Sequence, residues 1–551
     1  MKRRILCMIG ALFLLTGLLA GCKKDDGKDP FGEKNRTTDE VINNCYTDGF
    51  PIAKDPVTLK IMIKDYAGLT DYSDLALSKY MKEEMNVDIE WIVVPGGYEV
   101  NTQATLAYTS GDLPDIFMGM APLGYDFHWQ YMQQDYIVQL NPLIEKYGKN
   151  IIKMFKEVPE AEYQCTGPDG KVYMLPMVNY HEEDTGRFGM TPYINTTWLS
   201  NLGLSMPQTT DQLKNVLKAF KTNDPNGNQV ADEIPMSFAG DIPPGLYGPF
   251  GMSCYQGLEF VDDNQKVQFA PLTENYKKAL MYYRDLYKEG LLDKDLFEQS
   301  DEDVKQKANG TVSSVGVVMA YNNTSILDPQ RNMDEYEVLP PMAGPDGLKT
   351  WTYQVTESIW PEWFLITSKC KYPEIAIRIA DYFYSPEGTM TALYGPSGAG
   401  GWDYTSDKKG LINDDGTPEF RFKYSPGYPV PHFIGKDYID FRAKADESKY
   451  SVSQKVAARD ELVKLEKYAP VKPKYTLYKS SVNEEEIMED QLLRTDVVTY
   501  ANDSRKAFVK GERSIENEWD AYMQQMKSFE ADKWVGMHDS AYQRLLEWMN
   551  S

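Results

Sequence analysis

The chain has 551 residues, which is too long for one ordinary domain and predicts two or more lobes with large cores. Hydrophobic residues make up 42% of the chain and aromatic residues 13%, a composition that excludes a disordered protein. Acidic residues outnumber basic ones by 82 to 58, for a formal net charge of −24. No nucleic-acid partner is expected, because affinity for phosphates requires clustered Lys and Arg, and the sequence has no such cluster.

The first 21 residues have the features of a secretory signal peptide. Three cations precede an apolar stretch, Ile5 to Leu19, that is too short and wrongly flanked to span a membrane. Leu19 to Cys22 resembles a bacterial lipobox, which implies cleavage before Cys22 and attachment of lipid, such as palmitate, to that residue. We therefore expect residues 22–55 to be a flexible tether that holds the protein, by its lipid, at the extracellular face of the bacterial cell membrane.

The first part of the body is predicted to alternate strands and helices. We expect strands at 59–63, 87–94 and up to 118, with helices around 75–81 and 100–108 between them. This order is typical of a largely parallel sheet, in which ligands bind at the carboxyl ends of the strands. Tyr66 and residues 118–124 are then expected near a ligand.

A second α/β region is predicted to begin near Tyr193. Its expected elements are helices at 210–221 and 275–289 and a strand at 315–319. Further on, the pattern predicts a strand at 357–367 and one long helix at 373–393. The last hundred residues are mostly helical in pattern, ending in 516–550.

Residues 224–233 have a spacing of oxygen side chains that is typical of an EF-hand-like calcium loop. Carboxylate and amide oxygens stand at loop positions 1, 3, 5 and 9, and a backbone carbonyl stands at position 7. Gln229 occupies position 6, where the pattern has Gly, and the last acid is at position 10 instead of 12. The alternative is a plain surface turn rich in Asn, Gly and Asp. The candidate ligands of Ca²⁺ are Asp224, Asn226, Asn228, the Val230 carbonyl, Asp232 and Glu233.

Motifs for catalysis are absent from the sequence, so no enzyme is expected. There is no phosphate-binding loop, HExxH or GxGxxG, and the four histidines are not at metal-ligand spacing. Cys45, Cys165, Cys254 and Cys370 are scattered singly, which argues against a zinc or redox motif and leaves one or two disulfides open. A surface-attached polysaccharide hydrolase or lyase stays an alternative, because it needs only two facing carboxylates.

Aromatic residues beside polar ones, next to Gly or Pro, indicate a ligand with apolar faces and many hydroxyls, such as a sugar. The candidate stacking residues are Tyr66, Trp129, Trp360 and Trp402. The candidate hydroxyl partners are Arg187, Glu357 and Asp403.

Four segments together resemble the family 1 extracellular solute-binding proteins of carbohydrate ABC importers, of lipoprotein type. They are SGDLPDIF at 110–117, DGKVYMLP at 169–176, WLSNLGLSMP at 198–207 and SPEG at 385–388. The resemblance implies a monomer that captures an oligosaccharide and delivers it to permease subunits with a separate ATPase. In alginate-binding members the loop at 224–233 holds structural calcium, with Gly where Gln229 stands. A binding protein for another solute, such as a peptide, and an adhesive surface protein stay open.

The fold implied by the resemblance is an α/β two-lobed clamp of periplasmic-binding-protein type, with a helical C-terminal extension of the second lobe. The expected boundaries are 56–178 plus 350–395 for the first lobe and 190–337 plus 396–551 for the second. Hinge crossovers are expected near 174–190, 338–351 and 394–402, and closure about them would enclose the ligand.

Overall fold

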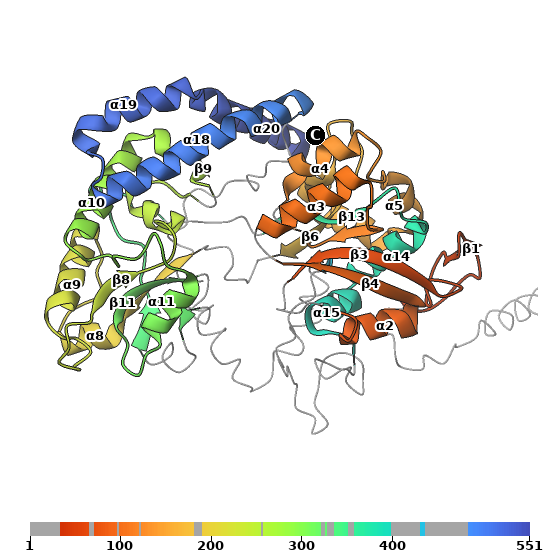
Figure 1. Cartoon of the computed structure of the whole chain (residues 1–551), viewed down its shortest axis with the longest axis horizontal. Helices are drawn as coiled ribbons and strands as arrows, with labels where there is room; N and C mark the ends of the chain where they lie inside the picture. The colour runs from red at the N-terminus through yellow and green to blue at the C-terminus, as the bar shows by residue number, and fades with distance from the viewer. Residues whose placement is uncertain are drawn as a thin grey trace, which may run out of the picture.

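A computed structural model describes residues 33–65, 71–95, 98–120, 123–180, 190–254, 257–320, 326–327, 335–350, 357–397, 430–435 and 483–550. Two lobes, each built on its own sheet, lie side by side, and the C-terminal helices run across the top of both (Figure 1). In the part of the chain described, no helix is both long and apolar enough to cross a membrane.

The larger lobe is built on a six-stranded sheet with the order β14-β6-β13-β5-β3-β4. Strand β3 is parallel to both β4 and β5, as the alternating pattern predicts. The whole sheet is mixed rather than largely parallel, because β13 runs antiparallel to β5 and β6. The strands are β3 (Val57–Lys64), β4 (Val87–Val94), β5 (Ile116–Met118), β6 (Leu175–Tyr180), β13 (Glu357–Ile366) and β14 (Phe433–Ile434). Strand β14 pairs with β6, although the expected boundaries assign its residues to the second lobe.

Eight helices of the described chain belong to the larger lobe. They are α2 (Ala76–Met85), α3 (Tyr98–Ser110), α4 (Gly124–Met132), α5 (Asn141–Tyr147), α6 (Lys149–Glu157), α7 (Pro159–Cys165), α14 (Pro373–Phe383) and α15 (Pro386–Tyr394). The single helix expected at 373–393 is therefore two helices. The break falls where Pro386 has no N–H to continue α14 and the Ser385 hydroxyl accepts a hydrogen bond from the Gly388 amide, capping α15.

Residues 33–55, named here the N-terminal clasp, pack against the larger lobe. The clasp contains the short strands β1 (Val41–Ile42) and β2 (Cys45–Tyr46). Cys45, Ile52 and Ala53 are fully buried in the core of the lobe. The structure thus differs over 33–55 from the tether expected over 22–55, since apolar residues of this segment complete the core of the larger lobe.

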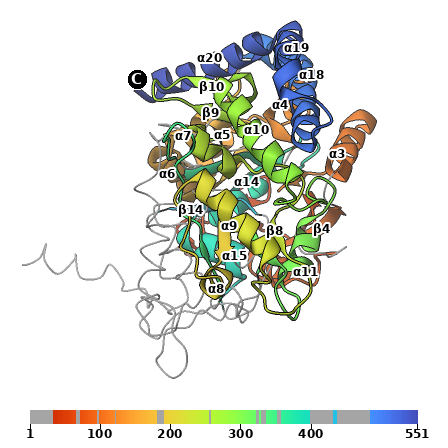
Figure 2. The same ribbon diagram turned by 90° about the vertical axis from the view of Figure 1, so that its left-hand side faces the viewer.

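The smaller lobe has a four-stranded sheet with the order β12-β7-β11-β8. Its strands are β7 (Thr191–Asn195), β8 (Ile234–Ser237), β11 (Val315–Ala320) and β12 (Tyr336–Val338). A hairpin of β9 (Glu259–Val261) and β10 (Val267–Phe269) lies apart from this sheet. The helical elements are α8 (Thr196–Asn201), α9 (Thr210–Thr222), η2 (Pro244–Phe250), η3 (Ala270–Leu272), α10 (Glu274–Lys288) and α11 (Asp301–Ala308), several of which face the viewer in Figure 2.

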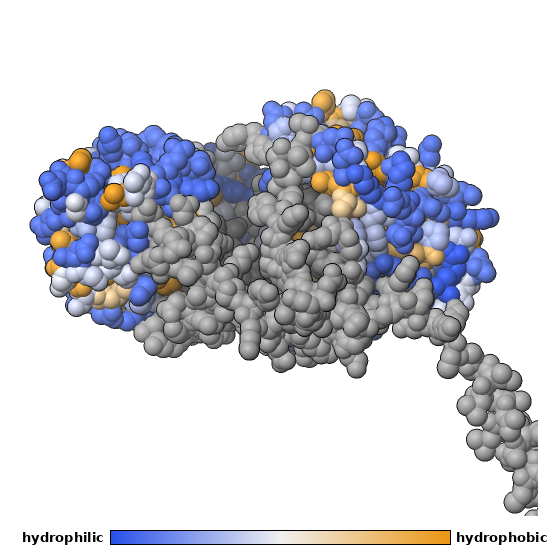
Figure 3. Space-filling model, turned by 90° about the horizontal axis from the view of Figure 1, so that it is seen from below, coloured by the Kyte–Doolittle hydropathy of each residue, from blue (hydrophilic) through white to orange (hydrophobic). Residues whose placement is uncertain are grey.

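The C-terminal helices are α18 (Glu484–Lys510), α19 (Ile515–Ser528) and α20 (Ala531–Asn550), which confirms the predicted helical extension. Phe508, Trp519, Tyr522 and Trp534 from these helices enter the core of the smaller lobe. The described surface seen from below is mainly hydrophilic with small separate apolar spots (Figure 3), as the acidic composition leads us to expect.

Candidate functional site between the two sheets

The strands of the larger sheet end together at one edge, named here the carboxyl edge. Lys64 at the end of β3 is opposite Val94 at the end of β4, and Ile63 is opposite Met118 at the end of β5. Because β13 is antiparallel to both β5 and β6, the end of β6 at Tyr180 extends toward the same edge, where it pairs with Glu357. The backbone of Glu357 thus lies at the edge where a ligand is predicted.

The smaller sheet has an equivalent carboxyl edge. Ala320 at the end of β11 is opposite Thr191, the first residue of β7, and Ser237 ends the neighbouring parallel strand β8. The chain passes from Tyr180 on one carboxyl edge to Thr191 on the other. Ten intervening residues can span at most about 40 Å. The return from Val338 to Glu357 joins the same two edges, so both edges border the region between the lobes.

Two of the predicted stacking residues lie in the described chain, and they differ in exposure. Trp360 in β13 is half-buried, with its ring 6.5 Å from that of Trp363. Trp129 in α4 is only 6% exposed and its ring meets Tyr173 edge-on at 6.5 Å, so in this structure it packs in the core of the larger lobe. Tyr66, Arg187, Trp402 and Asp403 lie outside the described residues.

Two polar residues near the carboxyl edge were not singled out from the sequence. Asn179, the second-last residue of β6, is half-buried, and its Oδ1 lies 3.2 Å from Nε2 of the buried His432. The other ring nitrogen of His432 lies 3.1 Å from the Val430 carbonyl, and burial lowers the pKa of this histidine to about 4. No local pattern connects two residues so far apart in the chain, so only the pairing of β14 with β6 reveals them.

His128 does not act as a titrating group near neutral pH. It is fully buried in α4, its Nδ1 lies 3.0 Å from the Tyr108 hydroxyl, and burial lowers its pKa to about 3. The ring is therefore neutral and forms part of the core of the larger lobe.

The loop at 224–233 brings three carboxylates together. The Asp224 carboxylate accepts hydrogen bonds from the backbone amides of Asn228 and Gln229, and Gln229 has a φ of 63°, the left-handed backbone that favours Gly at this position. Burial and the charges of Asp232 and Asp224 raise the pKa of Glu233. Its Oε1 is buried and has no hydrogen-bond partner among the described residues.

These observations fit a divalent cation, because a bound positive charge would relieve the repulsion and supply the missing partner of Glu233. Within the described chain, however, no three His, Cys, Asp or Glu residues are already arranged around one metal position. Instead, the Asp232 carboxylate accepts hydrogen bonds from the side-chain amides of Asn226 and Asn228. Those amides would have to turn their oxygens inward for the loop to hold Ca²⁺.

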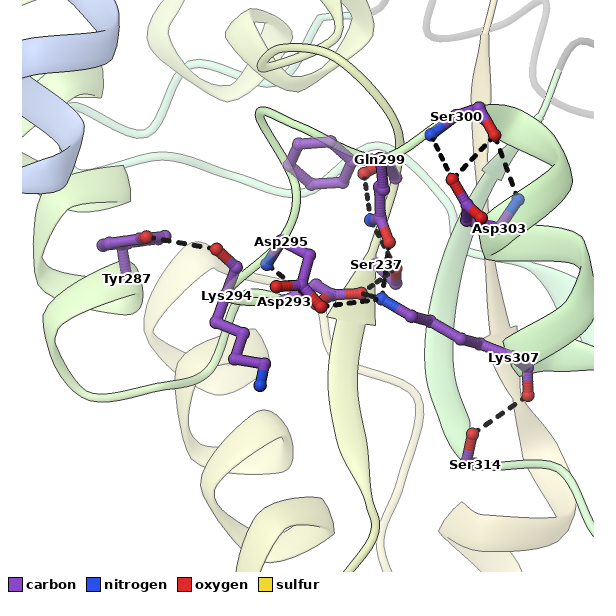
Figure 4. Close-up of polar contacts among 11 residues, drawn as sticks. Ser237, Tyr287, Asp293, Lys294, Asp295, Gln299, Ser300, Asp303, Lys307 and Ser314 are labelled. Carbon is purple, nitrogen blue, oxygen red and sulfur yellow. Dashed lines mark hydrogen bonds and ion pairs between the residues drawn. The ribbon is translucent and has the colours of Figure 1, made fainter.

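A polar network fixes the carboxyl end of β8 in the smaller lobe (Figure 4). The buried Asp293 carboxylate accepts from the Ser237 hydroxyl at 2.7 Å and from Lys307 at 2.9 Å. Burial would raise the pKa of Asp293, but these hydrogen bonds and the Lys307 charge outweigh it and lower the pKa. Gln299 donates to Ser237 and accepts from Lys307. The network therefore links the end of β8 to α11 and holds this part of the carboxyl edge in place.

Taken together, the two sheets and the two chain connections between their carboxyl edges define a two-lobed α/β binding protein. The chain belongs to the bacterial extracellular solute-binding protein family, whose model matches residues 66–390, more than half of the sequence.

One relative covers most of the chain. FusA of Streptococcus pneumoniae, a fructooligosaccharide ABC transporter substrate-binding protein, is 27% identical over 488 residues, which are 86% of this chain and 87% of FusA. The structure of FusA in complex with kestose superposes with a TM-score of 0.73 at 25% identity, covering 90% of this chain and 100% of that one.

Two further solved structures share the fold. An EF-hand mutant of FusA in complex with fructo-nystose has a TM-score of 0.73 at 24% identity and covers 90% of this chain and 100% of its own. The alginate-binding protein AlgQ2, crystallised without calcium ion, has a TM-score of 0.67 at 23% identity and covers 89% of this chain and 99% of its own.

Proposed function

We propose that this protein is the substrate-binding component of an ABC importer and captures an oligosaccharide between its lobes, with fructooligosaccharides as the first candidates. The similarity to FusA along nearly the whole of both chains carries this proposal. The two carboxyl edges, joined by two crossovers, supply a place where one ligand contacts both lobes at once. A ligand that prefers the closed arrangement then shifts the population toward it.

The proposed assembly follows from the N-terminal sequence and the family. Lipid on Cys22 would hold a monomer at the outer face of the cell membrane, where separate permease and ATPase subunits receive the ligand. Cleavage before Cys22 removes three cations and no anions, so the mature chain carries a formal charge of −27. Anionic lipid headgroups repel a protein of this charge, so the lipid on Cys22, rather than a basic surface, would hold the protein at the membrane. The same charge favours a neutral sugar over a uronate.

The proposed sugar contacts combine rings with hydrogen-bonding groups at the carboxyl edge. Trp360 offers a half-buried ring, and Glu357 and Asn179 lie near the end of β6. The proposal also includes four residues that follow strands or a glycine-rich segment in the sequence, namely Tyr66, Arg187, Trp402 and Asp403. In this structure the side chain of Trp129 packs in the core of the larger lobe.

Calorimetric titration of the mature protein with kestose, other neutral oligosaccharides, uronates and peptides tests this function. We expect saturable binding of a neutral oligosaccharide, and we expect Asn179→Ala to weaken that binding about fivefold, since a lost hydrogen bond to a sugar hydroxyl costs about 1 kcal/mol. Asn223→Ala, an exposed residue of the smaller lobe, is the matched control. Binding of peptides alone contradicts the sugar ligand. Turnover of a polysaccharide, lost on changing one carboxylate, establishes the hydrolase or lyase instead.

We also propose that the loop at 224–233 binds Ca²⁺ as a structural ion. Asp224, Asn226, Asn228, the Val230 carbonyl, Asp232 and Glu233 would hold it, and the ion would lock the connection between α9 and β8. The raised pKa of Glu233 and its unpartnered buried oxygen support this proposal. The EF-hand named in the FusA mutant supports it as well.

Chelation is expected to lower the melting temperature of the mature protein, because an ion at a hundred times its Kd stabilises the folded state by about 2.7 kcal/mol. Asp224→Asn should abolish this difference, whereas Asp263→Asn, which removes an exposed acid from the β9–β10 turn, should keep it. Since burial raises the pKa of Glu233, calcium affinity should weaken as the pH falls. Identical melting with and without chelator, and no ion in elemental analysis, would contradict the site.

A further inference from the structure

Strand β14 places a buried histidine against the end of β6. The two strands pair in parallel, and the Val178 amide of β6 donates to the His432 carbonyl at 3.0 Å. On the other side of β14, the Thr389 hydroxyl of α15 donates to the Phe433 carbonyl at 3.1 Å. His432 is only 5% exposed. Its ring is therefore held in a fixed position beside Asn179, at the carboxyl edge of the larger sheet.

The Val430 carbonyl decides which ring nitrogen of His432 carries the proton. Nδ1 of His432 lies 3.1 Å from this oxygen, which can only accept a hydrogen bond, so Nδ1 carries a proton and donates. The ring holds no second proton at neutral pH, because burial lowers its pKa to about 4 and no carboxylate of the described residues forms an ion pair with it. His538, by contrast, meets two carboxylates. Nε2 of His432 is therefore a lone pair that accepts.

The lone pair on Nε2 decides in turn how the side-chain amide of Asn179 is oriented. Oδ1 of Asn179 lies 3.2 Å from Nε2, an arrangement that fits a ring with protons on both nitrogens. A ring that is neutral requires a donor at this place, and the donor of the amide is its NH2 group. A half-turn of the amide exchanges its oxygen and nitrogen without moving other atoms. After this half-turn Nδ2 donates to Nε2, and Oδ1 faces away from His432.

We propose that His432 fixes the Asn179 amide with its oxygen toward the ligand, so that this position accepts a hydrogen bond from a sugar hydroxyl. Groups that can only accept, such as an ether oxygen or the carboxylate of a uronate, are then disfavoured there. Asn179 is half-buried, and His432 is the one side-chain partner of its amide in the described part of the chain. This inference rests on the proposed function. His432 is a positioning residue, because it acts through Asn179.

Nitrogen NMR of the ligand-free mature protein, labelled with ¹⁵N at histidine, tests the position of the proton. Couplings between ring nitrogens and ring protons distinguish a protonated nitrogen from a bare one. We expect His432 to have a protonated Nδ1 and a bare Nε2 at neutral pH, with its signals identified by their loss in His432→Gln. A proton on Nε2, or on both nitrogens, overturns the inference. This measurement needs no ligand, so it decides the inference even if the protein binds no glycan and the proposed function fails.

Calorimetry of the mature protein with kestose tests the direction of the hydrogen bond. The probes are kestose and analogues in which one hydroxyl at a time is replaced by hydrogen or by fluorine. At the hydroxyl that meets Asn179, both replacements should weaken binding equally, by about fivefold, because each removes an O–H donor worth about 1 kcal/mol. Asn179→Ala should abolish this loss. The inference is overturned if the fluoro analogue binds more tightly than the deoxy analogue there, or if no hydroxyl depends on Asn179.

His432→Gln tests whether the histidine sets this direction. The new amide can donate or accept by turning, so the Asn179 amide is no longer fixed, and the fluoro analogue should then bind more tightly than the deoxy analogue. His128→Gln, at another buried and neutral histidine of the larger lobe, should keep the wild-type pattern. The wild-type pattern in His432→Gln overturns the role of His432. If far-ultraviolet circular dichroism shows that His432→Gln has lost its fold, His432→Asn, which retains a donor for Val430, replaces it.

Discussion

A chain that begins at residue 56 is expected to lose the fold of the larger lobe, whereas a chain that begins at residue 33 is expected to keep it. The first deletion removes the N-terminal clasp and exposes the core that Cys45, Ile52 and Ala53 cover. It also removes Lys34, whose Nζ lies 2.7 Å from Oε1 of the nearly fully buried Glu387. Leaving a buried carboxylate without its cation costs about 3–5 kcal/mol.

Lys34→Met isolates the ionic part of this effect. Burial works to lower the pKa of Lys34, but Tyr80 and Glu387 raise it overall, so the side chain is charged at neutral pH. Urea unfolding should show a lower midpoint for Lys34→Met, and Lys54→Met, an exposed lysine of the same clasp, should behave as the wild type. Equal midpoints for the chains beginning at 33 and 56 would contradict a structural clasp.

His538→Gln is expected to destabilise the protein by about 3 kcal/mol below pH 6.5 and progressively less as the pH rises toward 9. Nδ1 of His538 lies 2.5 Å from Glu259 and Nε2 lies 2.7 Å from Asp490, so both nitrogens donate to carboxylates. Asp490 also accepts from the Trp534 indole at 2.7 Å. These contacts join the β9–β10 hairpin, α18 and α20.

The pH dependence follows from the direction of the shift. Burial alone would lower the pKa of His538, but the two carboxylates raise it to about 9, above the ordinary 6.5. The stabilisation is therefore complete below pH 6.5 and is lost as the pH rises through 9. Unfolding midpoints of the wild type and His538→Gln between pH 6 and 9.5 measure this difference. His432→Gln, at a buried histidine that stays neutral, is the control. A constant difference across this range would contradict a charged His538.

The sequence was sufficient to predict the elements whose signals are local. Strands β3, β4 and β5 follow the expected alternation. The calcium site stays a proposal, and it too rests on a local signal, a spacing within ten residues. The resemblance to solute-binding proteins was equally accessible, because its four segments stand in a fixed order along the chain, and the family model confirms it.

The features that the sequence did not predict depend on contacts between distant residues. The N-terminal clasp looks like a tether because its apolar residues are few and their partners are not local. The ring of Phe50, for example, lies 5.1 Å from that of Tyr382 in α14. Trp129 directly follows His128 on α4, and both turn into the core, an orientation that the position of α4 after β5 does not reveal. The same holds for β14, a two-residue strand identified only by its partner β6.

The order of strands in the two sheets has a consequence for secretion, during which the chain emerges from its N-terminus onward. All four strands of the smaller sheet come from one continuous stretch, residues 191–338. The larger sheet is complete only after β13 and β14 have emerged. We expect β7, β8, β11 and β12 to pair first, although the larger lobe begins to emerge earlier. The unpaired flanks of β5 and β6 stay exposed until β13 arrives between them, which makes this interval the stage most open to aggregation.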